Sequence, residues 1–153
     1  MKNFVVLIGM LFTLFTFAQE SLDLDAFDGL DCTIGVTINI IKSEDHKMAI
    51  SGDKKIVEGL KWEILDNNLM LQPAKEDIDY SEVTITLYTP SIRLLSMTNG
   101  GIVTLDNNFD RIRDFTAKAD YEAIIDLSDV KFVNLVTRST NGGEIRYNYS
   151  DHL

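Results

Sequence analysis

The chain has 153 residues, of which 45% are apolar and 25% are charged, and its formal net charge is −10. These values are typical of a soluble globular protein with room for one domain. The acidic balance argues against nucleic acid and anionic membrane surfaces as partners, because no cationic stripe is available to neutralise phosphates.

The first eighteen residues have the layout of a secretory signal peptide. Met1-Lys2-Asn3 supplies a positive start, an apolar run extends from Phe4 to Phe17, and Thr16-Phe17-Ala18 places small residues before a cleavage site. We therefore expect residues 1–18 to be removed and residues 19–153 to form a single exported domain in the periplasm or at the cell surface. No later stretch is long enough to span a bilayer as a helix, so we expect no membrane span in the mature chain.

The first half of the mature chain alternates apolar and polar residues, the period of half-buried strands. The clearest example is Thr33 to Ile41, in which Ile34, Val36, Ile38 and Ile40 share one face. Further strands are predicted at residues 21–27, 48–50 and 83–87, and a hairpin is predicted at residues 60–71 around Asp66-Asn67-Asn68. A single helical turn is expected near residues 56–60.

The second half contains a repeat. Thr98-Asn99-Gly100-Gly101 returns as Thr140-Asn141-Gly142-Gly143, and Ala119-Asp120-Tyr121-Glu122 lies halfway between them. A strand, a corner and a second strand recurring every 21 residues indicate stacked β-coils. We expect Asn99 and Asn141, or the glycines after them, to take positive φ.

A strict period of 21 places apolar side chains in columns inside the stack. One column would contain Leu94, Phe115 and Val136, and another Val103, Ile124 and Ile145. A third would contain Ser96, Ala117 and Arg138, where an inward arginine is costly, although a shift of one residue in the last coil would turn Arg138 outward.

The fold class predicted from these patterns is all-β. We expect a right-handed parallel β-helix-like solenoid with an N-terminal strand and hairpin section. The alternative is a β-sandwich, in which strands and turns also recur every 8–12 residues or so.

The order of strands and turns resembles the Bacteroidota "head GIN" family, an auto-transporter adhesin domain of unknown function. The similar segments are Phe27-Asp28-Gly29-Leu30-Asp31, Gly35 to Ile40, Met48 to Asp53, Asn68 to Leu71, Val83 to Leu87 with Pro90, Asn99 to Ile102, and Asn141 to Ile145. The middle corner, Asp120-Tyr121-Glu122, lacks the small residues of the family pattern. The resemblance implies a β-helix-like fold and an exported location, and it carries no catalytic residues.

No metal or cofactor site is predicted. Asp106-Asn107-Asn108-Phe109-Asp110 begins like a calcium loop, but Arg111 stands where glycine is needed and the distal glutamate is missing, so we interpret the segment as a turn. His46, His152 and the lone Cys32 are too scattered for a zinc site.

Two kinds of functional surface remain open. A polysaccharide-acting lyase or hydrolase would need clustered carboxylates with neighbouring cations, and the corner around residues 118–144 could bring together Glu122, Lys118, Arg138 and Asp120. A binding surface could use exposed aromatic and polar side chains, and the candidates are Tyr121, Tyr147, Tyr149, Arg138 and Glu122, with Trp62 elsewhere.

The sequence therefore supports three hypotheses. The first is an exported, non-catalytic binding or adhesion module of the cell envelope, with a glycan or an envelope protein as partner. The second is an enzyme acting on polysaccharide, and the third is a structural scaffold of the envelope.

The signal peptide gives the first testable prediction. Intact-mass measurement of the exported protein should show a mature chain that begins at Gln19, because the apolar run ends at Ala18. A mass that includes Met1 would contradict it.

Overall fold

β-strands make up nearly all of the secondary structure in a computed structural model, which describes residues 18–148, with side chains from residue 21. The first half contains β1 (Ala18–Asp23), β2 (Gly29–Cys32), β3 (Thr37–Lys42), β4 (Lys47–Gly52), α1 (Lys54–Val57), β5 (Leu60–Leu65), β6 (Asn68–Pro73) and β7 (Thr84–Thr89). The second half contains β8 (Leu94–Met97), β9 (Ile102–Leu105), β10 (Arg111–Ala119), β11 (Ile124–Asp126), β12 (Lys131–Ser139) and β13 (Glu144–Arg146). The all-β class is confirmed, and the expected hairpin is β5–β6.

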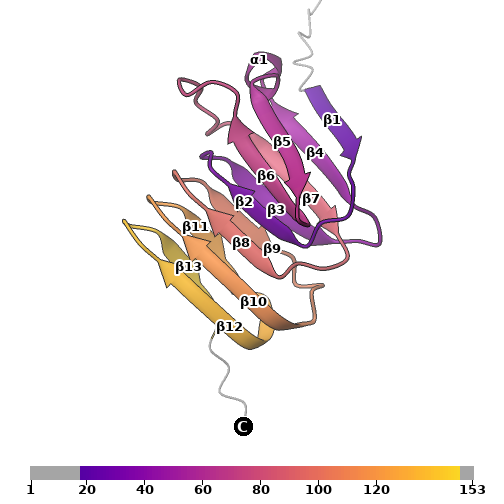
Figure 1. Cartoon of the computed structure of the whole chain (residues 1–153), viewed down its shortest axis with the longest axis vertical. Coiled ribbons are helices and arrows are strands. Elements are labelled where there is room, and N and C mark those ends of the chain that lie inside the picture. Colours follow the sequence, from indigo (N-terminus) through magenta and orange to yellow (C-terminus); the bar gives the residue numbers. More distant parts are fainter. Residues whose placement is uncertain (1–17, 149–153) are drawn as a thin grey trace, which may run out of the picture.

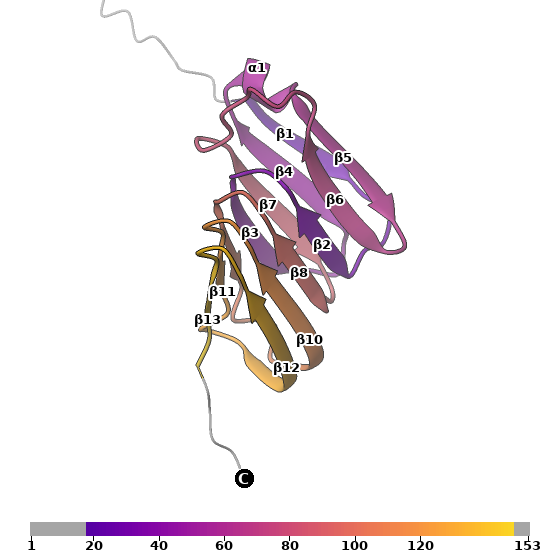
Figure 2. The ribbon, with the colours of Figure 1, turned by 60° about the vertical axis from the view of Figure 1, so that its left-hand side comes forward.

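The strands form two sheets that face each other as layers (Figure 1, Figure 2). The seven-stranded sheet has the order β1-β4-β7-β3-β9-β11-β13, and the six-stranded sheet has the order β12-β10-β8-β2-β6-β5. From β7 to β13 and from β6 to β12, every neighbouring pair is parallel. The antiparallel pairs involve only β1, β4 and β5, at the N-terminal end of the stack.

The parallel part consists of rungs, each with one strand in each sheet. The rungs follow one another in space as β6–β7, β2–β3, β8–β9, β10–β11 and β12–β13. The β2–β3 rung comes first in the sequence but lies second in the stack, so the chain passes from β7 to β8 across it. This insertion was not predicted, because nothing in the local pattern indicates which rungs are neighbours.

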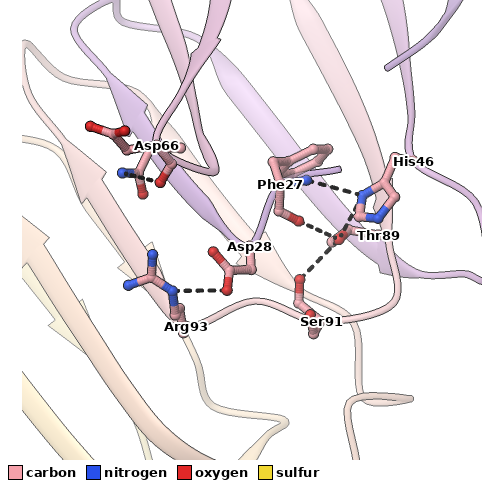
Figure 3. A network of polar contacts seen from close by, with 8 residues as sticks. Phe27, Asp28, His46, Asp66, Thr89, Ser91 and Arg93 are labelled. Atoms are coloured by element: carbon pink, nitrogen blue, oxygen red, sulfur yellow. Dashed lines mark hydrogen bonds and ion pairs between the residues drawn. The ribbon is translucent and has the colours of Figure 1, made fainter. Parts of the chain in front are cut away.

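A buried polar network holds the inserted rung in place (Figure 3). The hydroxyl of Thr89, which is 0% exposed, lies 3.2 Å from the carbonyl oxygen of Phe27 and 2.9 Å from that of Ser91. At the next residue of the rung, Asp28 accepts a hydrogen bond of 2.8 Å from the guanidinium of Arg93. These contacts satisfy polar groups at the point where the chain crosses between rungs.

The core lies between the sheets and follows the alternation of each strand. In one sheet, Ile38, Ile85, Val103 and Ile125 are cross-strand partners, and all four are 0% exposed. In the other, Leu30, Leu69 and Leu95 are partners and are likewise fully buried. No helix within residues 18–148 has the length and apolar character needed to cross a membrane.

The expected columns of period 21 are wrong for the middle coil. Leu94 pairs with Thr116, 22 residues later, and Thr116 pairs with Val136, 20 residues later, so Phe115 is not in the column of Leu94. Val103 likewise pairs with Ile125 rather than Ile124, and Ile125 pairs with Ile145. Phe115 and Ile125 are buried, whereas Val136 is 62% exposed.

The uneven period has its origin in the connections between β9 and β10 and between β11 and β12. Arg111 and Lys131 are partners at the start of β10 and β12, but Arg111 follows Val103 by eight residues and Lys131 follows Ile125 by six. The longer connection tucks Phe109 into the core, where it is 4% exposed. The average period remains 21, which hides the shift from a sequence comparison.

The corrected register also settles the direction of Arg138. It pairs with Lys118, which pairs with Ser96, so the third expected column is Ser96, Lys118 and Arg138. Both cations alternate with the buried Ala117 and Ala119 and face outward. The cost of an inward arginine does not arise.

The register yields a stability prediction. Ile125→Ala should lower the free energy of unfolding by about 2–5 kcal/mol, the range for truncating a buried aliphatic side chain. Ile124→Ala is the matched control, because the same residue type one position earlier is only half-buried. Ile145→Ala should cost less than Ile125→Ala, since β13 pairs with one described strand only. Equal losses for Ile124→Ala and Ile125→Ala in chemical denaturation would contradict the register.

Candidate functional site

Three corners connect the two sheets in the C-terminal half, and they lie side by side. They are the first corner (98–101), the middle corner (120–123) and the last corner (140–143), and they project as a stepped row of loops in Figure 1. The middle corner therefore aligns with the repeat as Asp120-Tyr121-Glu122-Ala123. Glu122 shares a position with Gly100 and Gly142, and not with Gly101 or Gly143 as expected from period 21.

Left-handed backbone conformations define the corners. Asn99 and Gly100 have φ of 70° and 78°, and Asn141 and Gly142 have φ of 47° and 81°, as predicted. The last glycine of each motif is required by close approach, because a Cβ at Gly143 would lie 2.3 Å from the carbonyl oxygen of Ala119. Asn and Gly accept these conformations at little cost.

The middle corner adopts the same conformation with unsuitable residues. Tyr121 has φ of 48° and Glu122 has φ of 62°. A residue with a large side chain pays roughly 1–2 kcal/mol to enter this region. Tyr121 is nevertheless 55% exposed, and Glu122 is exposed as well, so core packing does not explain either residue. Strained positions of this kind concentrate at functional sites.

A shallow depression of about 250 Å³ lies beside the middle corner, where β8, β10 and β12 end. It is lined by Ser96, Met97, Thr98, Lys118, Ala119, Asp120, Arg138 and Thr140. Met97 and Ala119 are buried and contribute little side-chain surface, so outward polar and charged groups dominate the lining.

Asp120 organises the edge of this depression. Its Oδ1 accepts hydrogen bonds from the Thr140 hydroxyl and the Asn141 amide, both at 2.8 Å, and from the backbone N–H of Tyr121 at 3.0 Å. The donors from Thr140 and Asn141 hold the pKa of the Asp120 carboxyl below its ordinary value, and the positive charge of Arg138 acts in the same direction. Asp120 is therefore a carboxylate at neutral pH, and it ties the last corner to the middle one.

The structure brings together some of the predicted site residues and separates others. Arg138 lies in the depression, and Tyr121 and Glu122 follow Asp120 in the adjoining corner. Tyr147 follows β13 at the opposite end of the coil and is 41% exposed. Tyr149 lies outside the described residues. Trp62 is on β5, at the other end of the stack.

Sequence reasoning missed three hydroxyl groups of the lining, those of Ser96, Thr98 and Thr140. The signal that could have found them is the repeat itself, since Thr98 and Thr140 begin the two identical motifs. Lys118 and Asp120, named only for the enzyme hypothesis, are part of the same depression as Arg138.

The chemistry of this arrangement favours binding over hydrolysis. Glycoside hydrolysis by acid and base needs two carboxyl groups, one of which has a raised pKa so that it can donate a proton. Asp120 is the only carboxylate in the lining of the depression, and its pKa is lowered. Two cations, three hydroxyls and one carboxylate instead suit the recognition of a polar ligand.

The segment Asp106 to Asp110 is a turn. Both carboxylate oxygens of Asp106 accept hydrogen bonds from Asn108, one from the backbone at 3.2 Å and one from the side-chain amide at 2.7 Å. Within residues 18–148, no group of three or more His, Cys, Asp or Glu side chains is placed to hold a metal ion.

The strain in the middle corner gives a prediction for stability. The double substitution Tyr121→Asn and Glu122→Gly should raise the free energy of unfolding by about 1–2 kcal/mol, because both new residues accept positive φ cheaply. Glu63→Gly on strand β5 is the control, and it should destabilise the protein because glycine is unfavourable within a strand. Thermal denaturation of the variants checks both; an unchanged or lower melting temperature for the double variant would refute the strain argument.

Solved structures resemble the fold. A protein described as a putative adhesin from Bacteroides fragilis matches with a TM-score of 0.75 at 18% identity, over 84% of this chain and 61% of its own. One from Parabacteroides merdae matches with a TM-score of 0.72 at 11% identity, over 86% of this chain and 56% of its own. One from Parabacteroides distasonis matches with a TM-score of 0.66 at 12% identity, over 86% and 55%. The chain thus spans a little over half the length of these relatives, and identities this low show the fold alone.

The family follows from the sequence comparison. Among proteins with curated descriptions, none matches the chain. A family model described as "Putative auto-transporter adhesin, head GIN domain" matches residues 26–149, which includes both parallel sheets and all three corners. The chain belongs to this head GIN family of auto-transporter adhesin domains.

Proposed function

We propose that this protein is an exported, non-catalytic adhesion module of the cell envelope that binds its partner with the middle corner and the adjoining depression. Membership of a family described as adhesins supports the binding role. The apolar segment before Ala18 supports export, since it has the length and flanking residues of a signal peptide. In this proposal the parallel rungs form a right-handed β-helix-like scaffold that presents the corners.

The observation that carries the proposal is the exception in the row of corners. Its neighbours use Asn-Gly at the positions of positive φ, whereas the middle corner places an exposed tyrosine and an exposed glutamate there. A stability cost without a packing benefit is the pattern expected where a surface is kept for binding. An aromatic ring beside polar groups is suited to contact with a sugar or a protein surface.

A polysaccharide-acting enzyme is the second candidate, because Lys118, Asp120 and Arg138 meet in one depression. The single carboxylate makes this reading weaker than binding. A reducing-end assay on candidate polysaccharides would separate the two, since an enzyme releases new chain ends and a binding module releases none.

The test of the proposed function is retention of the purified mature chain on envelope fragments from the producing cells. Retention should fall at least tenfold for the Tyr121→Asn/Glu122→Gly variant, although that variant is more stable. Tyr147→Asn is the matched control, because it removes a tyrosine of similar exposure at the far end of the coil and should leave retention unchanged.

Pretreatment of the fragments identifies the kind of partner. Periodate destroys glycans and protease destroys proteins, so the loss of retention after one treatment assigns the partner to that class. Full retention of the Tyr121→Asn/Glu122→Gly variant would show that the middle corner is not the contact surface.

A further inference from the structure

Two outward cations lie side by side in the depression. Lys118 and Arg138 are cross-strand partners on the parallel strands β10 and β12, so their backbones lie about 4.8 Å apart. Neither takes part in the ion pairs formed within residues 18–148, although the chain as a whole has ten more negative than positive charges. Adjacent like charges repel, so this arrangement costs stability unless an anion lies between them.

The same depression offers groups of the opposite character. The three hydrogen bonds to Asp120 all use Oδ1, so Oδ2 is available as an acceptor. Ser96, Thr98 and Thr140 add hydroxyl groups, which both donate and accept. A bare inorganic anion would use the two cations only, whereas a ligand that carries both a carboxylate and hydroxyl groups would use the whole set.

We propose that the depression binds the carboxylate of a single hexuronate residue in a glycan, with Lys118 and Arg138 holding the carboxylate and Asp120 accepting a sugar hydroxyl. This inference rests on the proposed binding role and names its ligand class. The planar guanidinium of Arg138 can form two parallel hydrogen bonds with a carboxylate, and Lys118 adds a second charge. Tyr121 stands next to Asp120 in the corner, where its ring can contact the face of the sugar.

The charge of the whole protein limits the kind of acidic glycan. A net charge of −10 repels a long polyanion such as a polyuronate or a nucleic acid. An isolated uronate in an otherwise neutral chain meets the local pair of cations without that penalty. We therefore expect weak, salt-sensitive binding of single acidic sugars.

The experiment uses the full mature chain and a pair of small probes that differ only at the carboxylate. Methyl β-glucuronide should shift the backbone NMR signals of residues 96–98, 118–120 and 138–140, and methyl β-glucoside should not. Sodium acetate should produce at most a tenfold weaker effect, because it lacks the hydroxyl groups. Binding of the glucoside as tight as that of the glucuronide would overturn the role of the cations. Binding of acetate as tight as that of the glucuronide would overturn the recognition of the sugar.

Variants test the assignment of each group. Arg138→Gln and Lys118→Gln should each weaken glucuronide binding at least tenfold, while Asp120→Asn should not lose the carboxylate interaction, since it removes a repelling charge. Arg111→Gln and Lys131→Gln are the matched controls, because these two cations are also partners on β10 and β12 but lie outside the depression. Equal losses for both pairs would reduce the effect to net charge and refute the site.

The two proposals can fail separately. Retention on envelope fragments with no response to methyl β-glucuronide would refute the uronate site and leave the adhesion module standing. A glucuronide response without retention on the fragments would leave the site and refute the envelope partner.

Discussion

Parallel pairing in register across both sheets is the constraint on which the rest of this structure depends. It requires that the chain reach the second sheet after the same number of residues in every rung. Four rungs meet this requirement with a step of eight residues, from Gly29 to Thr37, Leu94 to Ile102, Thr116 to Ile124 and Val136 to Glu144. The corners must therefore make the same tight reversal each time, which is why positive φ recurs there.

The connections at the opposite end of the coil are free of this constraint, and they are where prediction from the sequence failed. The class, the hairpin and the corners were predictable because each depends on a few neighbouring residues. The register of the middle coil was not, since two unequal connections average to the apparent period. The place of the β2–β3 rung was not predictable either, because contacts such as that of Asp28 with Arg93 join residues far apart in the sequence.

Register also decides which part of the candidate site can be found from the sequence. In a strand, a shift of one residue turns every side chain to the other face. Arg138 was identified as a surface candidate and Lys118 as its neighbour, but only the observed pairing shows that both face outward in one depression. Tyr121 and Tyr147 look equivalent by composition, and the fold places them at opposite ends of a coil.

The site is built across a step in stability. Lys118 and Asp120 belong to a rung with parallel neighbours on both sides, whereas Arg138 and Thr140 belong to β12 and its corner, which pair with described strands on one side only. The hydrogen bonds from Thr140 and Asn141 to Asp120 fasten this outer rung at the corner, next to Arg138. Because the folded pKa of Asp120 is lowered, these bonds contribute at neutral pH and are lost as the pH falls below the ordinary value of 3.8. The carboxylate that organises the depression is therefore also the group that keeps its two cations together.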